Sequence, residues 1–146
     1  MAEKMPQTRE NHARLVPMFH FVAGPILIGL FIWSIVRLIR EPSVDGAGNV
    51  ALLFALQVVF LFARVFALKA QDRVIRLEEQ LRYQRLLSAD LLARIGEFTI
   101  EQYVSLRFAS DAELPKLART VLDQKLTDQK QIKAMISEWR PDYQRV

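Results

Sequence analysis

Two long stretches without a charged side chain constrain this sequence more than any other feature. They cover residues 15–36 and 46–63, and neither contains Asp, Glu, Lys or Arg. A helix needs about 20 apolar residues to cross a hydrocarbon core about 30 Å thick, and both stretches are close to that length. The segment between them combines charges with proline and glycine, which is typical of a turn. The sequence therefore predicts a transmembrane helical hairpin over 15–68, with a turn at about 40–49.

The distribution of Lys and Arg around the hairpin predicts its orientation. Only Arg37 and Arg40 lie on the turn side, whereas a larger basic group flanks the outer ends of the two spans. This group consists of Lys4, Arg9, Arg14, Lys69, Arg73, Arg76, Arg82 and Arg85. Because basic residues accumulate on the cytoplasmic side of membrane helices, we expect both termini in the cytoplasm. The local excess at Lys69, Arg73 and Arg76 is expected to bind anionic lipid headgroups.

The predicted spans contain few polar side chains. Gln57 lies near the middle of the second span, where an amide is expected to form a hydrogen bond to another helix. Arg64 is expected either to extend towards the cytoplasmic surface or to bond the Phe21 carbonyl that Pro25 leaves without its usual donor. The candidate headgroup or ligand site, with a plain polar collar at the membrane surface as its structural alternative, consists of Asn11, His12, Arg14, His20 and Arg64. Its two histidines are about 12 Å apart along a continuous helix, so no metal site is predicted.

After the second span, the apolar residues follow a helical period. The stripe consists of Val74, Leu77, Leu81, Leu87, Leu91, Leu92, Ile95 and Phe98. Polar and charged side chains fall largely on the other side, among them Glu79, Arg82 and Tyr83. This pattern predicts one amphipathic helix over 69–98, continuous with the second span. Gln84 and Ser88 interrupt the stripe, so a long coiled coil is not predicted.

Capping residues divide the rest of the chain into short helices. Thr99 and Gln102 have the spacing of a capping box, and Asp111 and Thr127 are expected to cap two later helices. The apolar side chains of these helices are expected to form the core of a small helical bundle that packs against the amphipathic helix. We therefore predict an all-α fold in four parts: an N-terminal segment 1–14, the hairpin 15–68, the amphipathic helix 69–98 and a helical C-terminal domain 99–146.

The C-terminal half shows little sign of catalysis or nucleic-acid binding. From Lys69 onward it carries 14 Lys+Arg and 12 Asp+Glu, unlike the basic surface that nucleic acids require. Nucleotide-binding, hydrolase and metal-binding motifs are absent from the sequence, and the chain contains no cysteine. Arg107, Asp111 and Glu113 form the candidate polar cluster, with helix capping as its structural alternative. We therefore predict no catalytic residue, no metal and no cofactor.

Three separate stretches of the chain resemble a single family. They are the N-terminal run NHARLVPMFHF, the segment SLRFASDAELPKL and the ending IKAMISEWRPDYQRV. The chain resembles a family of small bacterial membrane proteins of unknown function, with two spans and a cytoplasmic helical tail. The resemblance implies a bacterial inner-membrane protein and implies no reaction. It also marks positions to test: Asn11, His12, Arg14, Pro17, His20, Arg107, Asp111, Glu113, Trp139 and Arg140.

The function expected from these features is structural, and an enzyme is not favoured. The hairpin anchors the protein among membrane lipids, and the helical tail docks a protein partner or a second copy of the chain. The alternative is an inner-leaflet protein that binds or chemically modifies a lipid or small ligand, using His12, His20 and Arg64. An apolar stripe left uncovered in the monomer would favour docking, whereas a polar cavity joining those three residues would favour the ligand.

Overall fold

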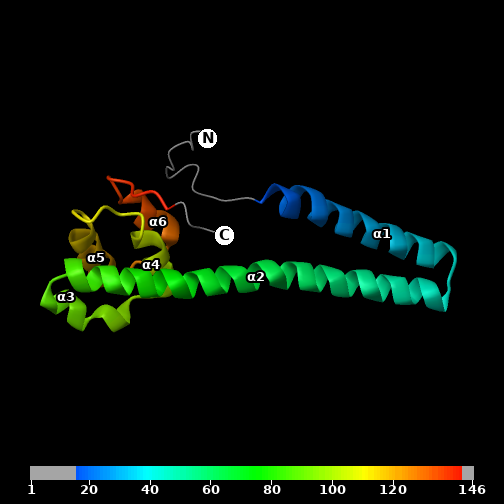
Figure 1. Cartoon of the computed structure of the whole chain (residues 1–146), viewed down its shortest axis with the longest axis horizontal. Helices are drawn as coiled ribbons and strands as arrows, with labels where there is room; N and C mark the ends of the chain where they lie inside the picture. The colour runs from blue at the N-terminus through cyan, green and yellow to red at the C-terminus, as the bar shows by residue number, and fades with distance from the viewer. Residues whose placement is uncertain (1–15, 143–146) are drawn as a thin grey trace. The chain divides into compact units, whose positions relative to one another are not determined.

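The structure is a computed structural model that describes residues 16–142. Every regular element in this range is a helix: η1 (Met18–Ala23), α1 (Gly24–Arg40), α2 (Val44–Leu86), α3 (Ala89–Ala93), η2 (Ile95–Glu97), α4 (Ile100–Leu106), α5 (Leu114–Asp123) and α6 (Gln129–Ala134) (Figure 1). The predicted all-α fold is therefore confirmed for these residues. The chain divides into two compact units, described here as the hairpin unit, which ends at Leu68, and the tail unit, which begins at Lys69.

Two helical runs are long and apolar enough to cross a membrane. They are Met18–Arg40 and Val44–Leu86, judged by length and composition. The first run contains Pro25, which has no N–H and whose ring would clash with the carbonyl of the preceding turn. The π-helix η1 widens that turn, because the Gly24 N–H donates to the Phe19 carbonyl five residues earlier. The run therefore passes through the proline without a break in the helix.

The connection between α1 and α2 is shorter than the predicted turn at about 40–49. Only residues 41–43 separate the two helices. Ser43 explains the early start of α2, because its Oγ accepts a hydrogen bond from the Gly46 N–H at 3.0 Å and caps the helix. Gly46 also allows close packing, since a Cβ there would lie 3.1 Å from Cδ1 of Leu38. Asp45, Gly46 and Gly48, which were expected in the turn, therefore belong to the first turns of α2, whereas Glu41 and Pro42 lie in the connection.

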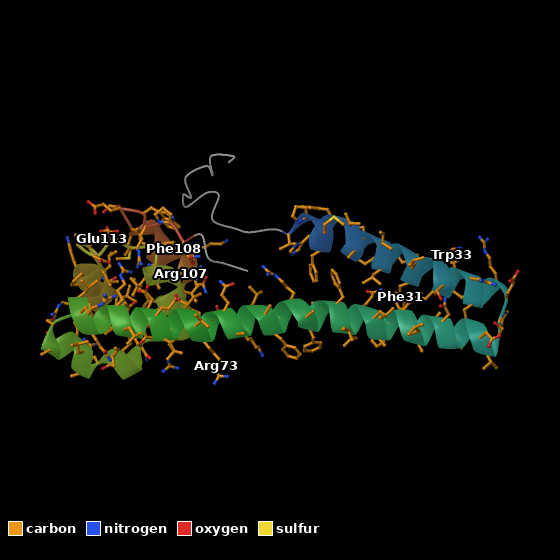
Figure 2. All side chains as sticks on the ribbon, viewed as in Figure 1. Phe31, Trp33, Arg73, Arg107, Phe108 and Glu113 are labelled. Carbon is orange, nitrogen blue, oxygen red and sulfur yellow. The ribbon has the colours of Figure 1, made fainter. Side chains whose placement is uncertain are left out.

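Aromatic pairs join the first helical run to α2 within the hairpin unit. Phe19 stacks on Phe60 with ring centroids 3.9 Å apart, and the rings of Phe31 and Phe54 lie 6.2 Å apart. Figure 2 shows Phe31 directed towards α2 and Trp33 directed away from it. The order of the two pairs along the chain is that of an antiparallel helix pair.

The second long helix ends before the predicted amphipathic helix does. α2 stops at Leu86, and Ser88 is extended, with φ −68° and ψ 158°, so 69–98 is not one helix. The chain then turns back through α3 and η2 and buries Leu91 and Phe98 in the tail core. A continuous helix of 30 residues would be about 45 Å long and would carry these apolar side chains away from α4–α6. The break is favourable because it removes them from water.

The reversal of the chain also changes which side of α2 is buried. Val74, Leu77 and Leu81 belong to the predicted apolar stripe, yet they are 52%, 62% and 62% exposed. The buried side carries three polar residues that were expected in solvent: Glu79, Arg82 and Tyr83. The prediction was therefore wrong about this helix. Arg82 can occupy the buried side because Asp111 and the Ala109 carbonyl, in the loop after α4, compensate for its loss of water.

Three aromatic rings form the centre of the tail core. Tyr83 on α2, Tyr103 on α4 and Phe98 between η2 and α4 lie with ring centroids 5.4 to 5.5 Å apart in each pair. Figure 1 shows α4, α5 and α6 beside the C-terminal part of α2. The largest fully buried side chains that complete this core are Leu91, Leu106, Leu114, Val121 and Ile132.

Capping geometry confirms one predicted helix start and corrects two others. α4 begins with the predicted capping box, in which Thr99 and Gln102 exchange hydrogen bonds between side chain and backbone. α6 is capped by the carboxylate of Asp128 and not by Thr127. Asp111 does not cap α5, because its carboxylate is bonded to a side chain of α2.

Candidate functional site

A buried ion-pair network joins α2 to the loop between α4 and α5. Arg82 lies on the core side of α2 and is only 4% exposed. Its Nε donates to Asp111 Oδ1 at 2.8 Å, and Nη2 donates to the Ala109 carbonyl at 2.7 Å. Its Nη1 donates to Glu79 Oε2 at 3.2 Å. Because a buried guanidinium requires partners for its N–H groups, this arrangement attaches the loop to α2.

Glu79 is the second buried charge of this network. Loss of hydration by burial raises the pKa of its carboxyl group above 4.5, although the positive charges of Arg82 and Arg140 act in the opposite direction. Nη1 of Arg140 lies 3.8 Å from Glu79 Oε1. The carboxylate is therefore placed between one cation on its own helix and one from the C-terminal segment.

A second carboxylate, Glu113, holds the C-terminal segment to the start of α5. Its Oε2 accepts hydrogen bonds from the Ser137 hydroxyl at 2.6 Å and the Ser137 N–H at 3.1 Å. Its Oε1 accepts from the N–H groups of Glu138 and Ser110 at 3.2 and 3.3 Å. Burial pushes the pKa of Glu113 upwards, but these hydrogen bonds outweigh it and leave the pKa below 4.5. Glu113 thus works as a structural link that requires the ionised carboxylate.

Backbone and ring contacts bring two distant tail segments together. Ala109 and Trp139 form an isolated antiparallel bridge, and the Arg140 N–H donates to the Phe108 carbonyl at 2.7 Å. The indole of Trp139 stacks on Phe108, with centroids 4.4 Å apart and planes inclined by 13°. The Arg107 guanidinium lies 4.5 Å from the centroid of the Phe108 ring. Figure 2 shows Arg107 and Phe108 on the side of α2 that faces the tail core.

The predicted tail residues therefore lie in one region. These are Arg107, Asp111, Glu113, Trp139 and Arg140, and they come from the two tail stretches that carried the family resemblance. Their contacts with α2 and with each other tie the C-terminal segment to the tail core. These contacts stabilise the fold, since each carboxylate is already bonded to a cation or to hydrogen-bond donors.

A cleft of about 590 Å³ lies beside the network in the tail unit. Its volume is in the range of small-molecule sites, and arginine is well suited to bind carboxylate or phosphate groups. The lining is of mixed charge: Arg82, Arg85, Arg107 and Arg140 with Glu78, Glu79 and Asp142. Within residues 16–142, no group of three His, Cys, Asp or Glu side chains could hold a metal ion.

The exposed apolar side of α2 is a second candidate site in the tail unit, and it adjoins the cleft, because Leu81 and Glu78 line both. We name it the α2 stripe: Ala70, Val74, Leu77 and Leu81. Arg73 flanks the stripe on one side and Glu78 on the other, and both are exposed. Figure 2 shows Arg73 projecting from the side of α2 opposite the one that faces Arg107. Contiguous apolar side chains in solvent commonly mark a surface that another molecule covers.

The predicted cluster at the membrane surface lies only partly in the described range. Asn11, His12 and Arg14 are outside residues 16–142. His20 lies in η1, where its Nδ1 accepts a local hydrogen bond from the Val16 N–H at 3.1 Å. Arg64 is half-buried on α2, and the expected headgroup residues that follow it are all exposed: Lys69, Arg73 and Arg76. The cleft in the tail unit is lined by neither His20 nor Arg64.

Within the hairpin unit Gln57 does not form the expected polar contact between the two helices, and its contact to a helix of another copy stays a prediction. Within the described residues the Gln57 side-chain nitrogen is buried without a hydrogen-bond partner. It lies at a hollow of about 340 Å³ that Gly24 and Phe60 also line. Asn49 instead donates from Nδ2 to Ser34 Oγ at 3.0 Å, and Ser34 is 4% exposed. This pair links α1 to α2 near their connection.

Two residue pairs that position these sites escaped the sequence analysis. The Glu79–Arg82 pair has a spacing that was visible in the sequence, but the same spacing is common on solvated helices. Only its burial distinguishes this pair from an ion pair of the same spacing on a solvated helix. The Ser34–Asn49 pair depends on the length of the connection between α1 and α2. Because Asn49 was assigned to a turn, its position opposite Ser34 could not be anticipated.

Comparison with known proteins identifies a family without a described activity. The model of a protein family of unknown function, designated DUF6526, matches residues 1–146, which is the whole chain. This match confirms the predicted resemblance to a family of unknown function. No curated protein and no solved structure matches the chain.

Proposed function

We propose that this chain, which belongs to the DUF6526 family of unknown function, is a membrane-anchored interaction protein. The two apolar helices anchor it in the inner membrane of a bacterium with both termini in the cytoplasm, and the tail unit docks a protein. The α2 stripe is the observation that carries this proposal. Three of its side chains, Val74, Leu77 and Leu81, are more than half exposed although they are apolar and lie on one side of α2. A partner that covers them would remove this apolar surface from water.

The hairpin unit supports the membrane anchor. Ser34 is the only buried residue of α1, so the apolar side chains of that helix are exposed around most of its circumference, as lipid contact requires. Trp33 is directed away from α2, so its indole is free to lie at the membrane interface, where tryptophan is enriched. Lys69, Arg73 and Arg76 follow the second apolar run and support a cytoplasmic tail beside anionic headgroups.

Photocrosslinking in the native membrane tests the docking role. A photoreactive amino acid replaces Leu77 in the full chain, and mass spectrometry identifies the adducts. We expect a protein adduct at this position. The same amino acid at Lys116, which is exposed on α5, is the matched control and should give no comparable adduct. Lipid adducts alone, or none, at position 77 would contradict the docking role.

Reporter fusions test the anchor independently of docking. An enzyme that is active only in the cytoplasm is fused to each end of the full chain. Activity at both ends is the expected result, because the basic residues lie at the outer ends of the hairpin. An inactive C-terminal fusion, together with activity of a second reporter that works only outside the cytoplasm at the same end, would overturn the proposed topology.

The cleft in the tail unit favours a second candidate function, the binding of a small anionic ligand. Arg107 and Arg140 supply guanidinium groups to a space of about 590 Å³, while the nearby carboxylates limit its net positive charge. The ligand site expected at His12, His20 and Arg64 stays a separate prediction. Native mass spectrometry of the full chain in nanodiscs tests the cleft. A bound small molecule that is lost in Arg140→Ala supports it, and an unliganded wild-type protein contradicts it.

A further inference from the structure

We propose that a second copy of this chain covers the α2 stripe, with the two α2 helices parallel and Arg73 of one copy facing Glu78 of the other. The inference rests on the proposed function, because it names the partner of the same docking surface. It follows from the spacing of the stripe, its position relative to the tail core, and the charges beside it.

The stripe has the spacing of a coiled-coil seam. Ala70, Val74, Leu77 and Leu81 are separated by four, three and four residues, which are the alternating steps of d and a positions in a heptad. The same steps lead back along α2 to two further small apolar residues, Ala63 and Ala67. Small residues allow two helix backbones to approach closely where the apolar run ends. The pattern is that of a helix whose partner is another helix.

The seam is accessible without disturbing the tail core. At 100° per residue, Val74 and Leu81 lie on the opposite side of α2 from Glu79, which is buried in the network. Arg73 projects away from the side that faces Arg107 (Figure 2). A second helix can therefore lie along the stripe while the helices α4–α6 keep all their contacts with α2.

The charges beside the seam favour an identical partner in parallel orientation. With Val74 at position a, Arg73 occupies position g and Glu78 occupies position e of the heptad that follows. In parallel coiled coils these positions face each other across the seam and form ion pairs between the helices. Within residues 16–142 neither side chain takes part in an ion pair in the monomer. Two copies would therefore form two Arg73–Glu78 pairs related by symmetry.

Two copies inserted in one membrane meet the remaining requirements of this pairing. The same insertion direction makes their α2 helices parallel. The next two seam positions are Gln84 and Ser88, so the contact ends at Leu81 and is short for a coiled coil. Anchoring both copies in the same bilayer raises their effective concentration, which allows a short seam to hold them together.

Cysteine crosslinking tests the seam, because the chain has no cysteine of its own. Single substitutions Val74→Cys, Leu77→Cys and Leu81→Cys are made in the full chain in nanodiscs or native membranes and oxidised. Disulfides require Cα atoms closer than about 7 Å, so disulfide-linked dimers are expected at these positions. The matched control is Arg76→Cys, which is exposed on the flank of the same helix and should give at least about fivefold less dimer.

Charge exchange tests the register. Arg73→Glu or Glu78→Arg places like charges across the seam and should lower the dimer yield about two- to tenfold. The double variant restores opposite charges without changing the net charge and should recover the yield. All these substitutions are at exposed positions, and the fluorescence of Trp139 reports whether the tail unit remains folded.

The outcomes separate this inference from the proposed function. Dimers at the seam positions with recovery in the double variant support the pairing. Dimers without recovery overturn the register of Arg73 and Glu78. No dimer at any seam position, together with a protein adduct of different sequence at position 77, overturns the second copy while the docking function stands. Lipid adducts alone at position 77 overturn both.

Discussion

Replacing Arg82 with methionine should destabilise the tail unit by about 3 to 5 kcal/mol. Methionine keeps an unbranched apolar side chain but leaves the buried Glu79 without its nearest cation, and breaking a buried ion pair costs about 3 to 5 kcal/mol. The Ala109 carbonyl also loses its donor at 2.7 Å. The Asp111 side chain is 66% exposed, so its lost pair adds less than about 1 kcal/mol. Arg140 at 3.8 Å from Glu79 offsets part of the total.

Urea unfolding followed by Trp139 fluorescence measures this loss in the tail unit. The Trp139 indole stacks on Phe108, so its emission changes when the C-terminal segment separates from the core. Trp33→Phe removes the only other tryptophan, and all variants are compared in this background in detergent or nanodiscs. Arg76→Met is the matched control, because Arg76 is exposed on the same helix outside the α2 stripe, and it should change stability by less than about 0.5 kcal/mol. A loss below about 1 kcal/mol in Arg82→Met would refute the role of the network.

The pH dependence tests whether charge is the cause. Burial raises the folded-state pKa of Glu79 above 4.5, so its favourable contribution is complete below pH 4.5 and is lost as the pH rises through the folded pKa. Without Arg82 this pKa should rise further. The deficit of Arg82→Met relative to wild type should therefore grow from about pH 4.5 towards neutrality, and Glu79→Gln in the same chain should reduce it. A deficit that does not vary with pH would contradict an electrostatic cause.

Three further substitutions test other contacts. Glu113→Gln should cost about 1 to 3 kcal/mol at pH 7 by weakening the bonds to Ser137. The folded pKa of Glu113 is lowered, so this contribution is present above pH 4.5 and is lost as the pH falls through the folded pKa. Urea unfolding measures the loss of stability in Glu113→Gln relative to wild type. Equal losses at pH 7 and pH 3 would contradict the role of the ionised carboxylate. Lys125 follows the end of α5 with φ 49°, a conformation that glycine adopts without the steric cost of a Cβ. Lys125→Gly should therefore raise the free energy of unfolding of the tail unit, measured in urea, by about 0.5 to 1 kcal/mol. A loss of stability would contradict this prediction. Asn49→Ala removes the donor to Ser34 and should lower the stability of the hairpin unit in detergent by about 0.6 to 1 kcal/mol, measured by thermal unfolding; an unchanged midpoint would count against the contact.

Features with a local cause could be predicted from the sequence. The apolar runs, the all-α fold and the capping box at Thr99 each depend on residues within a few positions of one another. The resemblance carried by the tail stretches also identified Arg107, Asp111, Glu113, Trp139 and Arg140 as a group. The chemistry of that group could not be predicted, because its hydrogen-bond partners, Arg82 and Ser137 among them, come from distant parts of the chain.

The amino-acid pattern by itself determined that this chain forms two long apolar helices and several short amphipathic ones. Periodicity and capping are properties of neighbouring residues, so the elements follow from them. Only the tertiary structure decided which side of α2 is buried. The chain reverses at Ser88, and the loop at Asp111 then supplies partners for Arg82, so the charged side of α2 faces the core and Val74, Leu77 and Leu81 remain in solvent. The free energy of that choice lies in contacts between residues far apart in the sequence, which a helical period does not contain.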